Sequence, residues 1–357
     1  MKVLVDDKIP YIKEAIERIA DEVVYLPGGR IAPDDVRDVD ALIVRTRTRC
    51  DRRLLAGSRV RFIATATIGF DHIDTAYCRE AGIEWANAPG CNAASVAQYV
   101  QSALLLLQRE RGVRLAGACL GVVGVGHVGR RVEAVGRALG MEVLRCDPPR
   151  ARQEGPDGFV GLDEIARRAD VVSFHTPLIR EGADRTFHLA DEAFFRSLER
   201  QPVLLNTSRG EVVDTEALKQ AWRADRLRAM VLDVWEHEPD IDRWLLGEAF
   251  LATPHIAGYS ADGKANATRM ALEALCRFFR LNPCFHIEPP APACPVLRTA
   301  TADEALLQMY DPRRDTEALR RAPERFEQLR GDYPLRREAC AYRVELGGRE
   351  QFGRGGA

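Results

Sequence analysis

The chain has 357 residues, of which 46% are apolar and 29% are charged, and its formal net charge is −2. This length predicts two or three domains, and the composition is typical of a soluble globular protein. The small net charge gives no electrostatic case for binding nucleic acid or a membrane surface. Nine cysteines at irregular spacings form no CxxC pair or Cys/His cluster, so we expect reduced thiols and no metal site. The first residues lack the apolar core of a signal peptide, and we therefore expect a cytoplasmic protein.

The first part of the chain alternates predicted strands with predicted helices. Residues 2–6 form a short apolar strand, and residues 11–20 place apolar side chains at helical spacing. Residues 41–46 and 60–67 are predicted as two further strands. Such alternation is typical of a parallel sheet that is covered on both faces. A long apolar helix over residues 94–110 follows a loop rich in glycine, proline and asparagine, which indicates a domain boundary.

The alternation starts again after this helix. Strands that end in polar or glycine residues are predicted at 119–126, 142–147, 169–177, 202–210, 229–235 and 249–258. Helices are predicted over residues 128–140 and 261–280. A proline-rich segment from residue 282 is typical of a linker, and the glycine-rich end of the chain is typical of disordered segments.

A glycine-rich loop joins the strand that begins at residue 119 to the helix that follows. Gly124, Gly126 and Gly129 have the spacing GxGxxG. The first glycine permits the tight turn, the second lets a pyrophosphate approach the backbone, and the third lets helix and strand pack closely. Asp147 ends the next strand, about twenty residues further on, where a ribose-binding acid belongs in a dinucleotide fold. The motif predicts a site that prefers NAD to NADP, because the Asp147 carboxylate would repel a 2′-phosphate. Arg145 and Arg150 lie close to Asp147 in sequence, so the preference is not certain.

Three later strand ends carry side chains of complementary chemistry. Arg209, Glu238 and His255 each follow a predicted strand, and the carboxyl ends of the strands in a doubly wound sheet meet at the ligand crevice. A neutral imidazole can accept the hydroxyl proton of a 2-hydroxy acid while the hydride goes to a nicotinamide. A carboxylate beside the ring favours imidazolium, and a guanidinium can bind the substrate carboxylate bidentately. Together these side chains predict hydride transfer without a metal ion.

The order of these motifs resembles the D-isomer-specific 2-hydroxyacid dehydrogenase family. The resemblance covers residues 1–285 and rests on the glycine loop and on the segments NTSRGEVVD, LDVWEHEP and TPHIAGY. It implies that Arg209 binds the substrate, that Glu238 is the partner acid, and that His255 donates and accepts the proton. The NAD contacts that it implies are Gly124, Gly126, Val128, Gly129, Asp147, Thr176, Asn206, Thr207, Ser208, Asp233 and Gly258.

The family resemblance also implies the fold and the domain boundaries. We expect two Rossmann-like lobes, each a doubly wound parallel sheet, and a small C-terminal α+β domain. The substrate-binding domain would comprise residues 1–95 and 258–285, and the NAD-binding domain residues 96–257. Residues 286–357 would form a dimerisation domain, and closure of the lobes would exclude water from the reacting groups.

Further segments resemble the members of this family that oxidise 4-phospho-D-erythronate during pyridoxal 5′-phosphate biosynthesis. These segments are ATATIGFDHID, APGCNAASVAQYV, TPHIAGYSADGKA and, near the end, YDPRRD and YPLRREACAY. They imply a homodimer in which Thr46, Thr67 and Tyr259 contact the substrate and 3-hydroxy-2-oxo-4-phosphooxybutanoate is the product. We also expect Arg45 or Arg47 to add positive charge near the phosphate.

Two alternatives stay open from the sequence. Another D-2-hydroxyacid dehydrogenase, such as a D-3-phosphoglycerate dehydrogenase, would carry the same catalytic side chains. A regulatory protein that senses NAD would keep the fold without turnover. Asp71 and His72 resemble a catalytic pair, but we expect them to cap the helix that follows.

Overall fold

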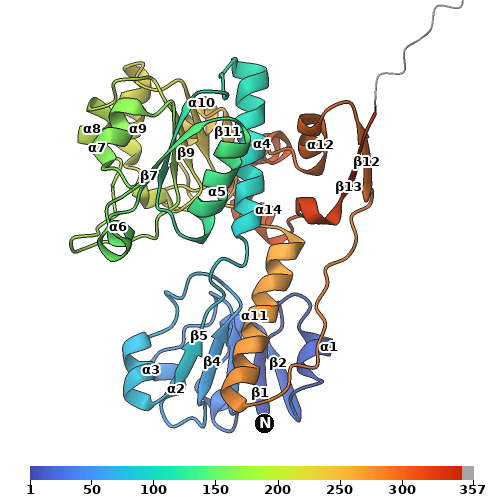
Figure 1. The fold of residues 1–357 in the computed structure, drawn as a ribbon. Helices are drawn as coiled ribbons and strands as arrows, with labels where there is room; N and C mark the ends of the chain where they lie inside the picture. The colour runs from blue at the N-terminus through green and yellow to red at the C-terminus, as the bar shows by residue number, and fades with distance from the viewer. Residues whose placement is uncertain (348–357) are drawn as a thin grey trace, which may run out of the picture. The chain divides into compact units, whose positions relative to one another are not determined.

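The computed structural model describes residues 1–347 (Figure 1). The chain divides into two compact units: Met1–Asn92 with Ser260–Ala291, and Ala93–Tyr259 with the residues from Pro292 onward. The glycine-rich end for which we expected disorder lies outside the described residues. Within residues 1–347, no helix is long and apolar enough to cross a membrane.

The first unit is built around a parallel sheet of five strands in the order β2-β1-β3-β4-β5. The side chains of β1 between Val3 and Val5 are fully buried, as expected for a parallel strand that is covered on both faces. Its strands are β1 (Lys2–Asp6), β2 (Glu22–Leu26), β3 (Ala41–Val44), β4 (Phe62–Thr65) and β5 (Glu84–Ala86). Its helices are α1 (Lys13–Ile16), α2 (Arg52–Leu55), α3 (Thr75–Ala81) and α11 (Ala261–Phe279).

Several details of this unit differ from the prediction, among them β5 and α2, which were not predicted. The helix predicted over residues 11–20 is limited to α1, and the segment that follows it forms β2, which the prediction did not include. The cap of α3 is Asp74, whose side chain accepts a hydrogen bond from the Tyr77 N–H at 2.9 Å. The expectation that Asp71 and His72 cap this helix was wrong, because an aspartate closer to the first turn occupies the position.

The second unit contains a parallel sheet of six strands in the order β11-β10-β9-β8-β6-β7. The chain leaves β6 for β7 on one side and returns to β8 on the other, which creates the switch point where ligands bind in such sheets. The strands are β6 (Cys119–Val123), β7 (Glu142–Cys146), β8 (Val171–Phe174), β9 (Val203–Asn206), β10 (Ala229–Leu232) and β11 (Leu251–Ala252). The helices are α4 (Ala93–Arg111), α5 (His127–Ala138), α6 (Pro148–Glu154), α7 (Leu162–Arg168), α8 (Glu192–Arg196), α9 (Thr215–Arg223) and α10 (Arg243–Glu248).

The C-terminal region belongs to the second unit and adds a small α+β layer to it. β12 pairs in parallel with β13, and the Thr316 hydroxyl of α13 accepts a hydrogen bond from the Ala252 N–H of β11 at 3.1 Å. The elements are β12 (Val296–Thr299), α12 (Ala302–Met309), α13 (Arg313–Arg321), α14 (Phe326–Gly331) and β13 (Arg343–Leu346). The expected fold class, with two parallel-sheet lobes and a small C-terminal α+β part, is confirmed.

Candidate active site

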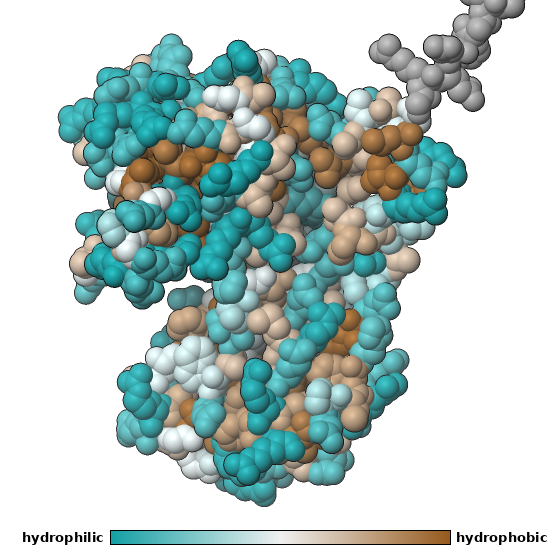
Figure 2. All heavy atoms as spheres, in the orientation of Figure 1, coloured by the Kyte–Doolittle hydropathy of each residue, from teal (hydrophilic) through white to brown (hydrophobic). Residues whose placement is uncertain are grey.

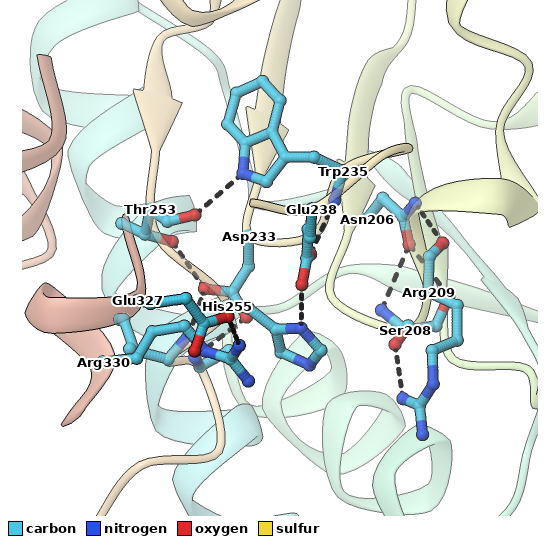
Figure 3. A network of polar contacts seen from close by, with 12 residues as sticks. Asn206, Ser208, Arg209, Asp233, Trp235, Glu238, Thr253, His255, Glu327 and Arg330 are labelled. Carbon is cyan, nitrogen blue, oxygen red and sulfur yellow. Dashed lines mark hydrogen bonds and ion pairs between the residues drawn. The ribbon is translucent and has the colours of Figure 1, made fainter. Parts of the chain in front are cut away.

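His255 and Glu238 form a hydrogen-bonded pair beyond the ends of β11 and β10. His255 Nδ1 lies 2.8 Å from Glu238 Oε2, and Glu238 Oε1 accepts the Trp235 N–H at 3.0 Å (Figure 3). Burial raises the pKa of Glu238, but the hydrogen bond and charge of His255 and the Trp235 N–H outweigh burial, and the net pKa is lowered. An ionised carboxylate therefore holds Nδ1 as the donor, which leaves Nε2 as the ring atom that can exchange a proton with a substrate.

Asp233 fixes the loop that carries His255. This residue follows β10 and is only 1% exposed. Its carboxylate accepts hydrogen bonds from the Thr253 hydroxyl at 2.6 Å and from the N–H groups of Ile256 and Ala257 at 2.8 and 2.9 Å. Burial raises the pKa of Asp233, although the charge of His255 and these three donors oppose the rise. The loop on both sides of the imidazole is thus tied to a single buried carboxyl group.

The loop after β9 presents Arg209 through a local network. The Asn206 side chain accepts hydrogen bonds from the Ser208 N–H and hydroxyl at 3.1 and 2.8 Å, and it donates to the Arg209 carbonyl at 2.9 Å. Gly210 approaches the loop after β10 so closely that a Cβ at this position would collide with the Trp235 carbonyl. The loops that carry Arg209 and Glu238 therefore lie against each other, as the convergence of parallel strand ends predicts.

Each of the three glycines in the loop between β6 and α5 is required for a different reason. Gly124 has φ +87°, and a Cβ there would collide with the backbone of His175. A Cβ on Gly129 would collide with the Gly124 carbonyl oxygen. By contrast, a Cβ on Gly126 would meet no atom within 4 Å. Space over the second glycine, at the start of a helix, is what a pyrophosphate requires.

Asp147 ties the end of β7 to this loop. Its carboxylate accepts the Val125 N–H at 2.8 Å and the Arg150 N–H at 3.1 Å. The two arginines near Asp147, Arg145 and Arg150, both bond within the protein, and Arg150 Nη1 also donates to the Val125 carbonyl of the glycine loop at 2.5 Å. Arg145 Nε donates to the Gly158 carbonyl at 2.9 Å, and the Arg150 guanidinium donates to the Glu154 carboxylate at 2.8 and 2.6 Å.

Two features after β8 fit a bound dinucleotide. Thr176 Oγ1 is buried and has no hydrogen-bond partner among residues 1–347, as expected of a polar atom whose partner is a ligand. His175 lies between the Ser173 hydroxyl at 2.8 Å and the Thr207 hydroxyl at 3.2 Å. Burial lowers the pKa of His175 to about 3, so the ring is neutral at physiological pH and links two strand ends without charge.

The substrate contacts predicted in the N-terminal part lie in the first unit, at the carboxyl ends of its strands. Thr46 follows β3 and is exposed, and Thr67 follows the neighbouring strand β4. The Thr67 hydroxyl lies 2.7 Å from that of Thr65, which in turn lies 3.0 Å from His72 Nε2. Arg45 Nε donates to the fully buried Asp6 carboxylate at 3.2 Å.

Tyr259, the third predicted substrate contact, lies in the second unit, where it meets a residue that the sequence did not indicate. Arg330 Nη2 donates to the Tyr259 hydroxyl at 3.4 Å. Thr253 was missed as well, although its hydroxyl bonds to Asp233 and lies 2.9 Å from the hydroxyl of Tyr99. Arg330 stands in no recognisable motif. Thr253 begins the segment TPHIAGY, but its role depends on partners far away in sequence, which only the fold brings to it.

The fold and the site define a class, the NAD-dependent oxidoreductases of hydroxy acids. Residues 92–257 match the family model described as D-isomer specific 2-hydroxyacid dehydrogenase, NAD binding domain. Residues 296–353 match a domain of unknown function, DUF3410.

Comparison with individual proteins makes the assignment more specific. The erythronate-4-phosphate dehydrogenase of Bacteroides fragilis is 62% identical over 97% of this chain and 99% of its own length. The erythronate-4-phosphate dehydrogenase of Porphyromonas gingivalis is 45% identical over 96% of this chain and 95% of its own. The D-lactate dehydrogenase of Aquifex aeolicus, solved with NAD and lactic acid, is 25% identical and superimposes with a TM-score of 0.62 over 78% of this chain and 96% of its own. The chain belongs to the D-isomer specific 2-hydroxyacid dehydrogenase family, and the predicted dehydrogenase activity and NAD cofactor are confirmed.

Proposed function

We propose that the chain oxidises 4-phospho-D-erythronate to 3-hydroxy-2-oxo-4-phosphooxybutanoate with NAD, as a cytoplasmic enzyme of pyridoxal 5′-phosphate biosynthesis. The choice of substrate is supported by the near full-length likeness to two erythronate-4-phosphate dehydrogenases. The chemistry is carried by one observation, the 2.8 Å contact between His255 Nδ1 and the Glu238 carboxylate.

The proposed reaction needs one base and one anchor from the protein. NAD, when bound, accepts the hydride that leaves C2 of the substrate. Nε2 of His255 takes the proton of the C2 hydroxyl, and the Glu238 carboxylate stabilises the imidazolium that results. Arg209 binds the substrate carboxylate and polarises the C2 oxygen. In the reverse direction the imidazolium returns the proton.

We propose the following roles for the remaining residues of the site. Asp147 would bind the ribose hydroxyls, and Asp233 would hold the nicotinamide carboxamide in addition to its loop. Thr46, Thr67 and Tyr259 would contact the substrate, with Arg45 or Arg47 close to the phosphate. The other proposed NAD contacts are Gly124, Gly126, Val128, Gly129, Thr176, Asn206, Thr207, Ser208 and Gly258.

We also propose that the C-terminal region forms a homodimer. Large apolar side chains remain exposed on it, among them Val344 at 39% and Leu346 at 57%, and Figure 2 shows apolar surface over β12 and β13. A sheet of only two strands is marginal on its own, and a partner that covers its apolar side chains would stabilise it. The domains would then serve substrate binding (residues 1–95 and 258–285), NAD binding (96–257) and dimerisation (286–357).

A substrate panel tests the proposed function. Purified protein and NAD are mixed with 4-phosphoerythronate, D-3-phosphoglycerate or D-lactate, and reduced nicotinamide is followed by absorbance. The reverse reaction is followed with each 2-oxo acid and NADH. We expect the highest kcat/KM for 4-phosphoerythronate. A higher value for D-3-phosphoglycerate would indicate a different member of the family, and no turnover of any compound in either direction would favour a regulatory protein.

A further inference from the structure

Arg330 brings a positive charge from the C-terminal region to the catalytic pair. It lies in α14, and its side chain is 22% exposed. Its guanidinium lies 5.9 Å from the ring centroid of Tyr259 and 5.8 Å from that of Phe326. Its charge is close enough to Glu238 to contribute to the lowered pKa of that carboxyl. In the view of Figure 3 the His255 imidazole lies between the guanidinium groups of Arg330 and Arg209.

The guanidinium of Arg330 is held in place but incompletely satisfied. Nη1 forms an ion pair with Glu327 at 3.0 Å, and Nη2 makes the long 3.4 Å contact with the Tyr259 hydroxyl. Nε is buried and has no acceptor within the described part of the chain. A buried donor without an acceptor is costly and is rare in native proteins. An oxygen supplied by a bound anion would remove this cost.

The charges of the proposed substrate match this arrangement. 4-Phosphoerythronate has a carboxylate next to the reacting C2 and a phosphate at the far end of the molecule. If Arg209 binds the carboxylate with C2 at His255, a cation beyond the imidazole can bind the phosphate in addition to the proposed Arg45 or Arg47. Arginine suits a phosphate because its fork can donate two parallel hydrogen bonds.

We propose that Arg330, together with the hydroxyl of Tyr259, forms a subsite for the phosphate of the substrate. This inference rests on the proposed function and extends it, since it makes α14 part of the active site. Glu327 then acts as a positioning residue that holds the guanidinium toward Tyr259. The C-terminal region would thereby determine specificity for a phosphorylated substrate.

Kinetics of Arg330→Gln and Arg330→Lys on two substrates test the proposal. Arg325→Gln is the matched control, because Arg325 is the residue directly before the same helix and its Nε donates to the Gln328 side chain at 2.9 Å. The substrates are 4-phosphoerythronate and D-erythronate, which lacks the phosphate. Inorganic phosphate is also titrated as a competitive inhibitor of 4-phosphoerythronate oxidation.

We expect Arg330→Gln to raise the KM for 4-phosphoerythronate and the inhibition constant of phosphate roughly 10- to 100-fold, the range of a lost charge-assisted hydrogen bond. kcat/KM for D-erythronate should stay within about twofold, because this substrate makes no use of the subsite. Arg330→Lys should recover part of the affinity for phosphate, and Arg325→Gln should change nothing.

Equal losses of kcat/KM on both substrates would overturn the proposal. Such losses with a lower Tm would indicate a structural residue, and such losses with an unchanged Tm would indicate a residue that acts through Glu238. Phosphate inhibition that is unchanged in Arg330→Gln would also overturn it. Failure of the wild-type enzyme to oxidise 4-phosphoerythronate would instead contradict the proposed function, so the two failures are distinguishable.

Discussion

At the scale of single residues, the site depends on carboxylates that accept hydrogen bonds from backbone N–H groups. Asp233 accepts two N–H groups of the loop around His255, and Glu238 accepts the Trp235 N–H while it holds the imidazole. Asp147 joins the glycine loop to the start of α6 in the same manner. Each carboxylate therefore fixes the backbone of a loop in the site, and each also places a negative charge where the ligand would bind.

Asp147→Asn removes the charge of Asp147 and one of its two acceptor oxygens. Asparagine can still cap α6 through the Arg150 N–H, but its NH2 group cannot accept the Val125 N–H, so we expect a loss of stability of about 1–3 kcal/mol. Loss of the charge removes both the repulsion of a 2′-phosphate and a strong acceptor for the ribose hydroxyls. We expect the ratio of kcat/KM for NAD to that for NADP to fall roughly tenfold or more, consistent with the 1.5–3 kcal/mol of a hydrogen bond to a charged group. Steady-state kinetics with both cofactors measure this ratio, and an unchanged ratio would contradict the assignment of Asp147 to the ribose.

The sequence predicts the residues of the site that stand at strand ends in recognisable patterns. Arg209, Glu238 and His255 follow β9, β10 and β11, and topology alone brings such strand ends to one edge of a sheet. Arg330 could not be predicted, because only the folded C-terminal region brings α14 to Tyr259. Asp71 was wrong as a helix cap because Asp74 offers the same side chain closer to the first turn of α3.

At the scale of elements, the β6–α5 turn combines glycines that pack against protein with one that faces open space. A Cβ on Gly129 would collide with the Gly124 carbonyl oxygen, whereas one on Gly126 would meet nothing within 4 Å. The spacing of the motif predicts the turn, but only the structure separates the glycine that folding needs from the glycine that a ligand needs.

Gly126→Ala and Gly129→Ala form a matched pair that tests this distinction. Gly129→Ala should destabilise the protein by about 1–3 kcal/mol, the usual cost of overpacking. Gly126→Ala should leave the stability nearly unchanged but weaken NAD binding about tenfold or more, because the methyl group occupies space that the pyrophosphate needs. Urea denaturation and NAD titration measure the two effects. Equal destabilisation by both variants, or unchanged NAD affinity in Gly126→Ala, would contradict this account.

Arg336 connects the C-terminal region to the catalytic loop and to α4. Its guanidinium donates to the carbonyls of Ser95, Ile256 and Ala257 at 2.6, 3.3 and 3.2 Å, and to the Gln98 side chain at 3.1 Å. The residue is 5% exposed. A single buried side chain thus joins α4 to the loop that carries His255.

Arg336→Met should lower the free energy of unfolding by about 1–3 kcal/mol, because it removes the Arg336 donor from the buried Ala257 carbonyl and from the Gln98 side-chain oxygen. Activity should fall as well, since Ala257 belongs to the loop that carries His255. Arg321→Met, at an exposed position of α13, is the control and should change neither quantity. Urea denaturation monitored by fluorescence provides the measurement, and a loss below about 0.5 kcal/mol, the level of an ordinary surface substitution, would contradict the inferred role.

At the scale of the whole molecule, the second unit combines a complete dinucleotide fold with a C-terminal region that packs on it. Periodicity predicts the long helices and the buried strands of both units, because their apolar residues recur with clear spacing. It fails for α1 and β2, which are short and partly exposed. The homodimer stays a prediction, which rests on the apolar side chains that β12 and β13 leave exposed.

Val344→Glu tests the proposed homodimer. A charge in a buried interface is strongly unfavourable, so the variant should be monomeric at concentrations where the wild-type chain is a dimer. Light scattering after size-exclusion chromatography measures the mass. Phe70→Ser, which removes an exposed aromatic side chain from the first unit, is the control and should remain dimeric. A wild-type mass of one chain would contradict the proposed dimer.

Turnover by a His255 variant tests the central claim, proton transfer by the His255–Glu238 pair, most directly. Asparagine is the suitable replacement, because His255 has φ +55° and asparagine tolerates this region. With saturating NAD and 4-phosphoerythronate, His255→Asn should lose about 10²–10⁴ in kcat, the usual contribution of a general base, while its affinity for NAD stays unchanged. A kcat within about twofold of the wild-type value would contradict the mechanism.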